Sequence, residues 1–137
     1  MRIILDTNVF VSGIFFTGPP YQILKAWRDR KIELVVSAGI LEEYQRVSDI
    51  LGERFPEVDL GSLIDLLIVE ATVVSESVLP EQTCADAEDD KFLACALAGD
   101  ASIIVSGDKH LLDVSGYRDI RVLSPRSFID EFSKSLS

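Results

Sequence analysis

Short apolar runs alternate with longer helix-like segments along this chain, and no other feature constrains the fold as strongly. Five runs have the length and composition of strands, and they cover residues 3–5, 33–36, 72–74, 102–105 and 121–123. Strands that alternate with helices predict an α/β fold: a three-layer α/β/α arrangement with a mainly parallel central sheet. The 137 residues contain no repeat and no long linker, so we expect a single domain over 1–137.

The segments between these runs carry helix start and stop signals. Proline suits a first helical turn, serine and aspartate are good N-caps, and glycine ends helices. These signals predict helices from Pro19, from Ser37 to about Leu51, after Asp59, over 88–98 and after Ser124.

The charge of the chain is concentrated in one segment. The net charge is -10, and ten acidic residues without a lysine or arginine lie between Phe55 and Asp90. The rest of the chain carries equal numbers of acids and bases. An acidic segment is usually a solvated face, and it argues against a protein that coats nucleic acid with positive charge. The stretch 86–90 is denser than such a face requires, because carboxylates this close repel unless something compensates them.

Cysteine content and hydropathy bear on the compartment. Cys84 and Cys95 form no CxxC motif and no disulfide framework, which favours a reduced, cytoplasmic protein. No apolar run approaches the roughly 18 residues that span a bilayer, so we expect no membrane partner. The apolar stretch up to Phe16 is interrupted by Asp6 and Asn8 and lacks a cleavage site, which indicates mature protein rather than a signal peptide.

Two aspartates follow predicted strands. Asp6 comes directly after the first run, and Asp108 lies three residues past the run at 102–105. Ligands of open α/β sheets bind outside the carboxyl ends of the strands. One such aspartate is more often a turn former or a cap, but two at equivalent strand ends indicate a shared site.

A glutamate on the predicted helix after Ser37 faces inward. At 100° per residue, an apolar arc is formed by Ile40, Leu41, Tyr44, Val47, Ile50 and Leu51. Glu43 falls inside this arc, whereas Glu42 falls opposite it. An inward carboxylate needs a partner, and a metal ion or a cleft explains it better than a buried arginine or a cap.

The acidic stretch before the predicted helix over 88–98 also turns inward. Asp89 and Asp90 lie on the side of its apolar face, and Asp86 joins them if the turn extends that far, whereas Glu88 points away. The helix dipole stabilises acids in a first turn by about 0.3–1 kcal/mol, which explains one or two of them but not several turned inward.

These acids together indicate a site for a hard cation. The set consists of Asp6, Glu43, Asp90 and Asp108, with Asp86 and Asp89 close by. Carboxylate ligands favour Mg²⁺ or Mn²⁺, and a single histidine with two dispersed cysteines makes zinc a poor fit. Such ions polarise phosphates and generate hydroxide from water, which suits phosphodiester hydrolysis. The chain has no phosphate-binding glycine loop and no serine-hydrolase motif.

Four motifs resemble those of PIN domains. They are Ile4-Leu5-Asp6-Thr7-Asn8-Val9, Ser37 with Ile40-Leu41-Glu42-Glu43-Tyr44, the stretch from Asp86 through Asp89-Asp90-Lys91 to Ala96, and Ile104-Val105-Ser106-Gly107-Asp108. They cover nearly the whole chain in the family's order. The stretches DTNVFVSG and SGDKHLL most resemble the corresponding sequences of the PIN branch that contains toxin components of toxin–antitoxin systems, relatives of VapC-type toxins.

The resemblance implies a metal-dependent ribonuclease. It makes Asp6, Glu43, Asp90 and Asp108 the catalytic acids holding Mg²⁺ or Mn²⁺, with Asp86 as an auxiliary ligand, and Asp90 is chosen over Asp89 by the spacing Asp-x-x-Leu-Ala. It gives Asn8 and Ser106 a supporting role through hydrogen bonds. It also implies a homodimer and a small antitoxin partner that blocks the site.

An RNA substrate also needs cationic contacts. The basic residues cluster at 25–31 and 109–126, and the best candidates for RNA contacts are Lys25, Arg28, Lys109 and His110. Each alone is as readily a solvated surface residue.

Two other functions remain open at this point. A PIN fold without catalysis would bind RNA or a protein, although the complete acid set argues against it. Phosphoryl transfer through an aspartate wants a second aspartate beside the first, where Asp6-Thr7-Asn8 offers an amide.

Overall fold

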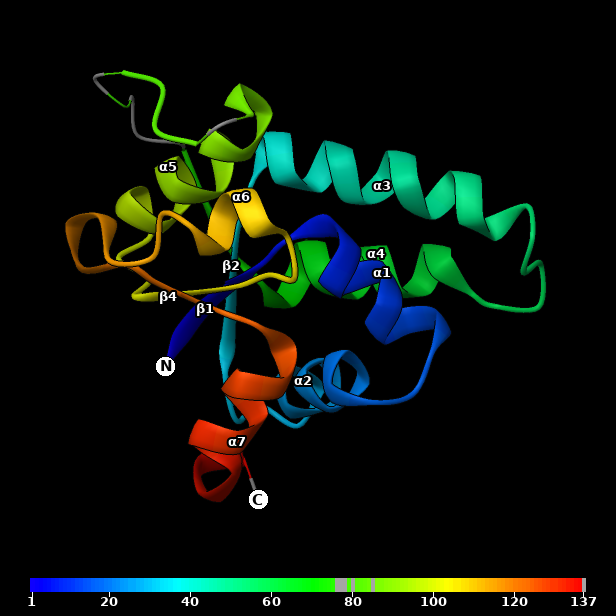
Figure 1. The fold of residues 1–137 in the computed structure, drawn as a ribbon. Helices are drawn as coiled ribbons and strands as arrows, with labels where there is room; N and C mark the ends of the chain where they lie inside the picture. Colours follow the sequence, from blue (N-terminus) through cyan, green and yellow to red (C-terminus); the bar gives the residue numbers. More distant parts are fainter. Residues whose placement is uncertain (76–78, 80, 85, 137) are drawn as a thin grey trace.

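Five parallel strands form the centre of the protein, as seen in a computed structural model that describes residues 1–75, 79, 81–84 and 86–136 (Figure 1). The strands are β1 (Arg2–Leu5), β2 (Glu33–Ser37), β3 (Thr72–Val74), β4 (Ile103–Val105) and β5 (Arg121–Leu123). They lie in the order β3-β2-β1-β4-β5, and every neighbouring pair is parallel. All five agree with the predicted runs, and β1 occupies the middle of the sheet.

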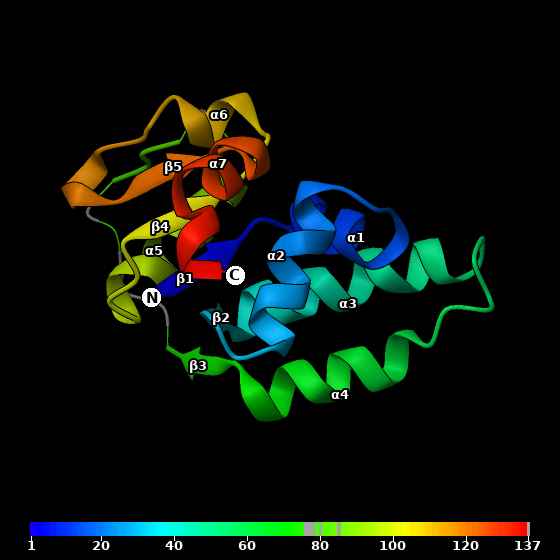
Figure 2. The same ribbon diagram turned by 90° about the horizontal axis from the view of Figure 1, so that it is seen from below.

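Helices connect the strands and cover the sheet. They are α1 (Thr7–Phe15), α2 (Pro19–Arg28), α3 (Ala38–Gly52), α4 (Leu60–Glu70), α5 (Asp90–Ala98), α6 (Lys109–Leu112) and α7 (Pro125–Leu136), with short 3₁₀ helices η1 (Ala87–Asp89) and η2 (Tyr117–Asp119). The path from β1 to β2 and the path from β3 to β4 cross the sheet in opposite directions. Right-handed crossovers therefore place α2 and α5 on opposite faces, and α7 packs beside α2 (Figure 2). This is the predicted three-layer α/β/α fold.

The described helices are too short or too polar to cross a bilayer.

Local signals explain where most helices begin. Ser37 accepts a hydrogen bond from the Ile40 amide at 3.3 Å and caps α3, and Asp59 accepts one from the Ser62 amide at 3.1 Å and caps α4. Both caps were predicted from the sequence, as was the start of α2 at Pro19.

Two helices were not predicted. α1 begins directly after Asp6, and its residues are apolar on nearly all sides, so no polar face distinguishes it from a continuation of the strand. α6 is a single turn capped by Asp108. The predicted helix over 88–98 also divides at Asp90, because residues before it form the 3₁₀ turn of η1.

The core lies around β1, β2 and β4, and it holds the carboxyl end of β1 in place. Phe10 of α1 stacks on Tyr44 of α3 with the ring centroids 4.2 Å apart, and the Tyr44 hydroxyl donates a hydrogen bond to the Leu5 carbonyl. α1 and α3 are thereby fixed against the last residue before Asp6. Further along α3, the helix extends past the core (Figure 1), and Ile50 is exposed although the helical projection placed it in the apolar arc.

Candidate active site

The carboxyl ends of β1 and β4 lie side by side and bring two sequence-predicted residues together. Leu5 pairs with Val105, so Asp6 and Ser106 leave the sheet as neighbours. The Ser106 hydroxyl donates a hydrogen bond to Asp6 Oδ2. The same hydroxyl accepts a hydrogen bond from the Asp108 amide at 2.9 Å. Ser106 therefore connects the two aspartates, in the supporting position that the resemblance implies.

Asp6 is a buried carboxylate with hydrogen bonds but no cation. Only 5% of the residue is exposed, and its Oδ1 accepts the Val9 amide at 2.8 Å as the N-cap of α1. Burial raises the pKa of Asp6, and the charges of Asp108 and Glu43 add to this, although the hydrogen bonds from Ser106 and Val9 oppose it. No lysine or arginine in the described part of the chain forms an ion pair with Asp6.

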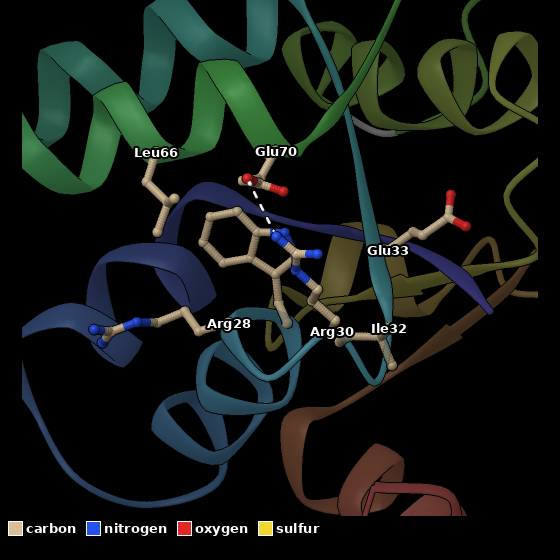
Figure 3. A pocket seen from close by; sticks show the side chains of 7 residues that line it. Arg28, Arg30, Ile32, Glu33, Leu66 and Glu70 are labelled. Carbon is tan, nitrogen blue, oxygen red and sulfur yellow. Dashed lines mark ion pairs between the residues drawn. The ribbon is translucent and has the colours of Figure 1, made fainter.

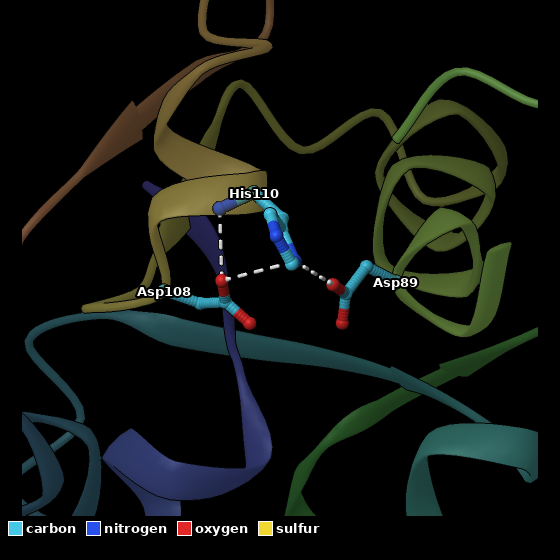
Figure 4. Close-up of side chains that lie close together, drawn as sticks. All are labelled: Asp89, Asp108 and His110. Atoms are coloured by element: carbon cyan, nitrogen blue, oxygen red, sulfur yellow. Dashed lines mark hydrogen bonds and ion pairs between the residues drawn. The ribbon is translucent and has the colours of Figure 1, made fainter. Parts of the chain in front are cut away.

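Asp89, Asp108 and His110 converge (Figure 4), and the charges of Asp89 and Asp108 are close enough to that of Asp6 to interact with it. His110 Nδ1 lies 3.8 Å from Asp108 Oδ1 and 4.0 Å from Asp89 Oδ2. The three potential ligand atoms lie within 4.8 Å of one another. Burial and the charges of Asp108 and Asp86 raise the pKa of Asp89 to about 6. The carboxylates of Asp89 and Asp108 are thus close enough to repel each other unless a cation lies between them.

Asp90 is not part of the group of Asp89, Asp108 and His110, which differs from the expectation that it joins the cluster. Its two carboxylate oxygens accept hydrogen bonds from the amides of Thr83, at 3.0 Å, and Cys84, at 2.7 Å. Burial tends to raise its pKa, but these backbone hydrogen bonds outweigh it and hold the pKa of Asp90 below its usual value. The cause is the 3₁₀ turn before α5, which turns through a larger angle per residue than the continuous α-helix assumed for 88–98.

The predicted auxiliary ligand Asp86 is exposed. It caps η1 by accepting the Glu88 amide at 3.0 Å, and it reaches the cluster only through its charge on Asp89.

Glu43 faces the site as the helical projection predicted, whereas Glu42 is exposed. Glu43 accepts hydrogen bonds from the Thr7 hydroxyl and from the Lys91 ammonium, the latter at 2.6 Å. Arg46 adds a weaker ion pair at 3.9 Å. Partial burial tends to raise the pKa of Glu43, but Lys91 and Thr7 outweigh it and hold this pKa below its ordinary value.

Thr7 and Lys91 were not singled out in the sequence. Thr7 directly follows Asp6 in the first motif, and this position could have indicated that it belongs to the site. Lys91 offers none, because the helical projection of 88–98 places it on the side away from the apolar face.

The structure separates the four predicted RNA contacts into two places. Lys109 and His110 lie next to Asp108 and are exposed. Lys25 and Arg28 belong to the end of α2, close to the chain that enters β2, and so lie near the amino edge of the sheet rather than its carboxyl edge. Lys25 pairs there with Asp29 at 2.7 Å.

A pocket of about 380 Å³ lies at this amino edge, around Trp27 (Figure 3). Its two carboxylates each have an arginine partner, since Arg30 pairs with Glu70 at 3.8 Å and Arg2 pairs with Glu33 at 3.3 Å. The pocket therefore lacks the unpaired acids that distinguish the carboxyl edge.

Asn8 is exposed in the first turn of α1. Among the described hydrogen bonds, none joins its side chain to the acids.

Two comparisons with known proteins agree with this arrangement. Residues 2–110 match the family model of the PIN domain. The chain is also 31% identical, over an alignment of 153 residues, to the uncharacterized protein MJ1680 of Methanocaldococcus jannaschii, and the alignment covers 100% of this chain and 95% of that protein. The sequence motifs, the parallel sheet and the acids at its carboxyl edge lead to one conclusion: this chain belongs to the PIN domain family.

Proposed function

We propose that this protein is a metal-dependent endoribonuclease that hydrolyses phosphodiester bonds of RNA. PIN domains are usually nucleases. The observation that carries the proposal is the group of Asp6, Asp89 and Asp108 at the carboxyl edge of the sheet, none of which forms an ion pair with a lysine or arginine among the described residues. Such a group is costly unless a cation joins it.

The donor set fits a divalent ion. The potential ligand atoms of Asp89, Asp108 and His110 lie within 4.8 Å of one another, close enough for one ion to be held by all three. We propose that these three residues and Asp6 hold Mg²⁺ or Mn²⁺. Two or more carboxylates with one imidazole suit either ion, and the imidazole favours Mn²⁺. When bound, the ion polarises the phosphate and lowers the pKa of a water molecule.

The protein's own residues fix the acids for this task. Ser106 and the Val9 amide hold both oxygens of Asp6, and the cap of α6 holds Asp108 Oδ1 on the His110 amide at 2.8 Å. Lys109 and His110 are exposed directly after Asp108, so RNA bound at the cluster would contact them. Lys25 and Arg28 would contact only an RNA long enough to reach the amino edge.

We further propose a role as the toxin of a toxin–antitoxin pair in the cytoplasm, acting as a homodimer that a small antitoxin inhibits. The resemblance of the motifs to VapC-type toxins supports it. The exposed apolar surface of α4, where Ile68 is 54% and Val69 77% exposed, supports the homodimer. If α4 forms the dimer interface, Val69→Asp lowers the mass measured by sedimentation from dimer to monomer.

Cleavage of labelled RNA by the purified protein, with Mn²⁺, Mg²⁺ or EDTA, tests the activity. Asp108→Asn lowers the rate at least about a hundredfold, because the bound ion stabilises charge in the transition state. Asparagine keeps the α6 cap, so this variant stays folded. Asp113→Asn, an exposed acid just after α6, is the matched control and keeps its activity. RNA binding without cleavage under every condition would instead support the non-catalytic function.

A further inference from the structure

Glu43 differs from the other acids of the site because the chain itself neutralises it. Oε1 accepts the Lys91 ammonium at 2.6 Å and lies 3.9 Å from Arg46, and Oε2 accepts the Thr7 hydroxyl. Both oxygens therefore already have partners. The side chains of Glu43 and Lys91 are only 21% and 17% exposed, so water screens this pair weakly.

Asp6, Asp89 and Asp108 show the opposite pattern. Within the described residues, the imidazole of His110 is the only basic group that lies within 4.0 Å of Asp89 or Asp108, and it carries a charge only when protonated. A divalent ion gains most where carboxylates lack a cation, and it would have to displace both Lys91 and Thr7 to bind the oxygens of Glu43. The site thus divides into two halves: Asp6, Asp89 and Asp108, which form no ion pair with a described lysine or arginine, and Glu43, which is paired with Lys91.

Lys91 joins Glu43 of α3 to the first turn of α5. It is two residues from Asp89 on the first turn of α5, and it also lies 3.8 Å from Glu88 Oε2 and 5.7 Å from the centre of the Phe92 ring. Among the described residues, the Lys91 ammonium donates one hydrogen bond, and Glu43 accepts it. Because an ammonium has three N–H groups, two remain for another acceptor.

We infer that Lys91, and not a metal ion, is the cation that Glu43 binds, and that Lys91 contacts a non-bridging oxygen of the substrate phosphate. Glu43 is then a positioning residue that acts through Lys91. The inference rests on the proposed nuclease function for its substrate. Lys91 would neutralise part of the phosphate charge, and an ion held by Asp6, Asp89 and Asp108 would neutralise another part.

A charge-neutral exchange tests the metal half of this inference. The double variant Glu43→Gln, Lys91→Met removes both charges together and leaves no buried charge without a partner. Its Mn²⁺ affinity, measured by titration calorimetry, stays within about threefold of the wild type, because distant or unshared sites act nearly independently. Asp89→Asn lowers the affinity at least about tenfold. A tenfold loss in the double variant would show that Glu43 is a ligand and overturn the inference.

Cleavage and RNA binding test the lysine. Lys91→Met lowers the cleavage rate at least about tenfold at saturating Mn²⁺, whereas Lys91→Arg retains most of it, since a guanidinium also binds carboxylate and phosphate. The control Lys134→Met, at an exposed lysine of α7 outside both basic clusters, keeps the wild-type rate. Equal rates for Lys91→Met and the wild type would overturn the inference.

The two failures are distinguishable. If the wild type cleaves no RNA, the proposed function is wrong, and the calorimetric comparison still decides whether Glu43 binds the ion. If Lys91→Met does not fold, the comparison of Lys91→Arg with the wild type still decides the outcome: a drop to the level of Asp89→Asn in Mn²⁺ affinity contradicts the inference.

Discussion

Asp89 and Asp90 are neighbours of the same chemical type in opposite environments. Asp89 lies against Asp108 and His110, and its pKa is raised, whereas Asp90 binds two backbone amides of the preceding loop, and its pKa is lowered. The 3₁₀ turn before α5 thus directs Asp89 toward Asp108 and His110, and Asp90 toward the backbone of the preceding loop.

These neighbours give a matched pair of substitutions. Asp90→Asn loses one of two charge-assisted hydrogen bonds and destabilises the protein by about 1–2 kcal/mol, with Mn²⁺ affinity nearly unchanged. Asp89→Asn loses affinity at least about tenfold and keeps its fold. Urea denaturation and calorimetry on both variants check this. A loss of Mn²⁺ affinity in Asp90→Asn but not in Asp89→Asn would show that Asp90, rather than Asp89, binds the ion.

The raised pKa of Asp89 also sets a pH dependence. The folded protein holds this proton more tightly than the unfolded chain does, with pKa values of about 6 and about 4 respectively. The stabilising contribution is therefore full below about pH 4 and is lost as the pH rises through 6. In EDTA at pH 7.5, Asp89→Asn should melt about 3 °C above the wild type, and at pH 4 the two should melt together.

Manganese provides the control for this measurement. It raises the Tm of the wild type at pH 7.5 but not that of Asp89→Asn, because only the wild type binds it tightly. A variant that melts below the wild type in EDTA at pH 7.5 would show that Asp89 carries no such penalty.

At the scale of the elements, the acids of the site are also helix caps. Asp6 caps α1, Asp108 caps α6 and Asp86 caps η1. The amide groups at a helix start carry partial positive charge, which partly offsets the crowding of carboxylates at this edge. The same aspartates thus mark where the helices begin and supply the negative charge at the carboxyl edge of the sheet.

The helices that support Asp6 pack closely, and Gly13 permits it. A Cβ at Gly13 would lie 2.6 Å from Leu24 Cδ1 and 2.8 Å from the Pro20 carbonyl oxygen of α2. Gly13→Ala therefore destabilises the protein by about 1–2 kcal/mol, since the clash exceeds the gain of about 1 kcal/mol in helix propensity. Gly61→Ala in α4 is the control, because its Cβ would approach nothing closer than Asp59 Oδ1 at 3.8 Å. Denaturant midpoints compare them, and equal stability would show that α1 and α2 have room to move apart.

The sequence predicted the strands, the caps of α3 and α4 and the inward turn of Glu43, because each rests on a local pattern. It did not predict α1, whose residues carry no amphipathic signal. Asp90 was preferred to Asp89 by the spacing Asp-x-x-Leu-Ala, and neither that spacing nor the helical projection shows the 3₁₀ turn that directs the two side chains differently. The pairing of Lys91 with Glu43 joins α5 to α3 and has no local signature at all.

At the scale of the whole molecule, the two predicted basic groups lie at opposite edges of the sheet. Lys109 stands by the acids, and Lys25 and Arg28 stand near the amino edge. Lys25→Met with Arg28→Met should weaken the binding of long RNA and reduce the slope of log affinity against log salt by about 1.4, since two phosphate contacts disappear.

Short RNA provides the comparison. Lys109→Met weakens the binding of short and long RNA alike, whereas the double variant at Lys25 and Arg28 acts on long RNA alone. Fluorescence anisotropy over a range of salt concentrations measures both. An equal effect of the double variant on short RNA would place the α2 residues beside the scissile phosphate.

The central position of β1 has a consequence for biosynthesis. Asp6 directly follows β1, but β1's neighbour β4 comes late in the chain, and Ser106, the partner of Asp6, lies 100 residues after it. A nascent polypeptide that has exposed β1, β2 and β3 has one open side along β1 and lacks Asp89, Ser106 and Asp108. Under the proposed ribonuclease function, the nascent chain therefore lacks activity until Ser106 and Asp108 have emerged and β4 has paired with β1.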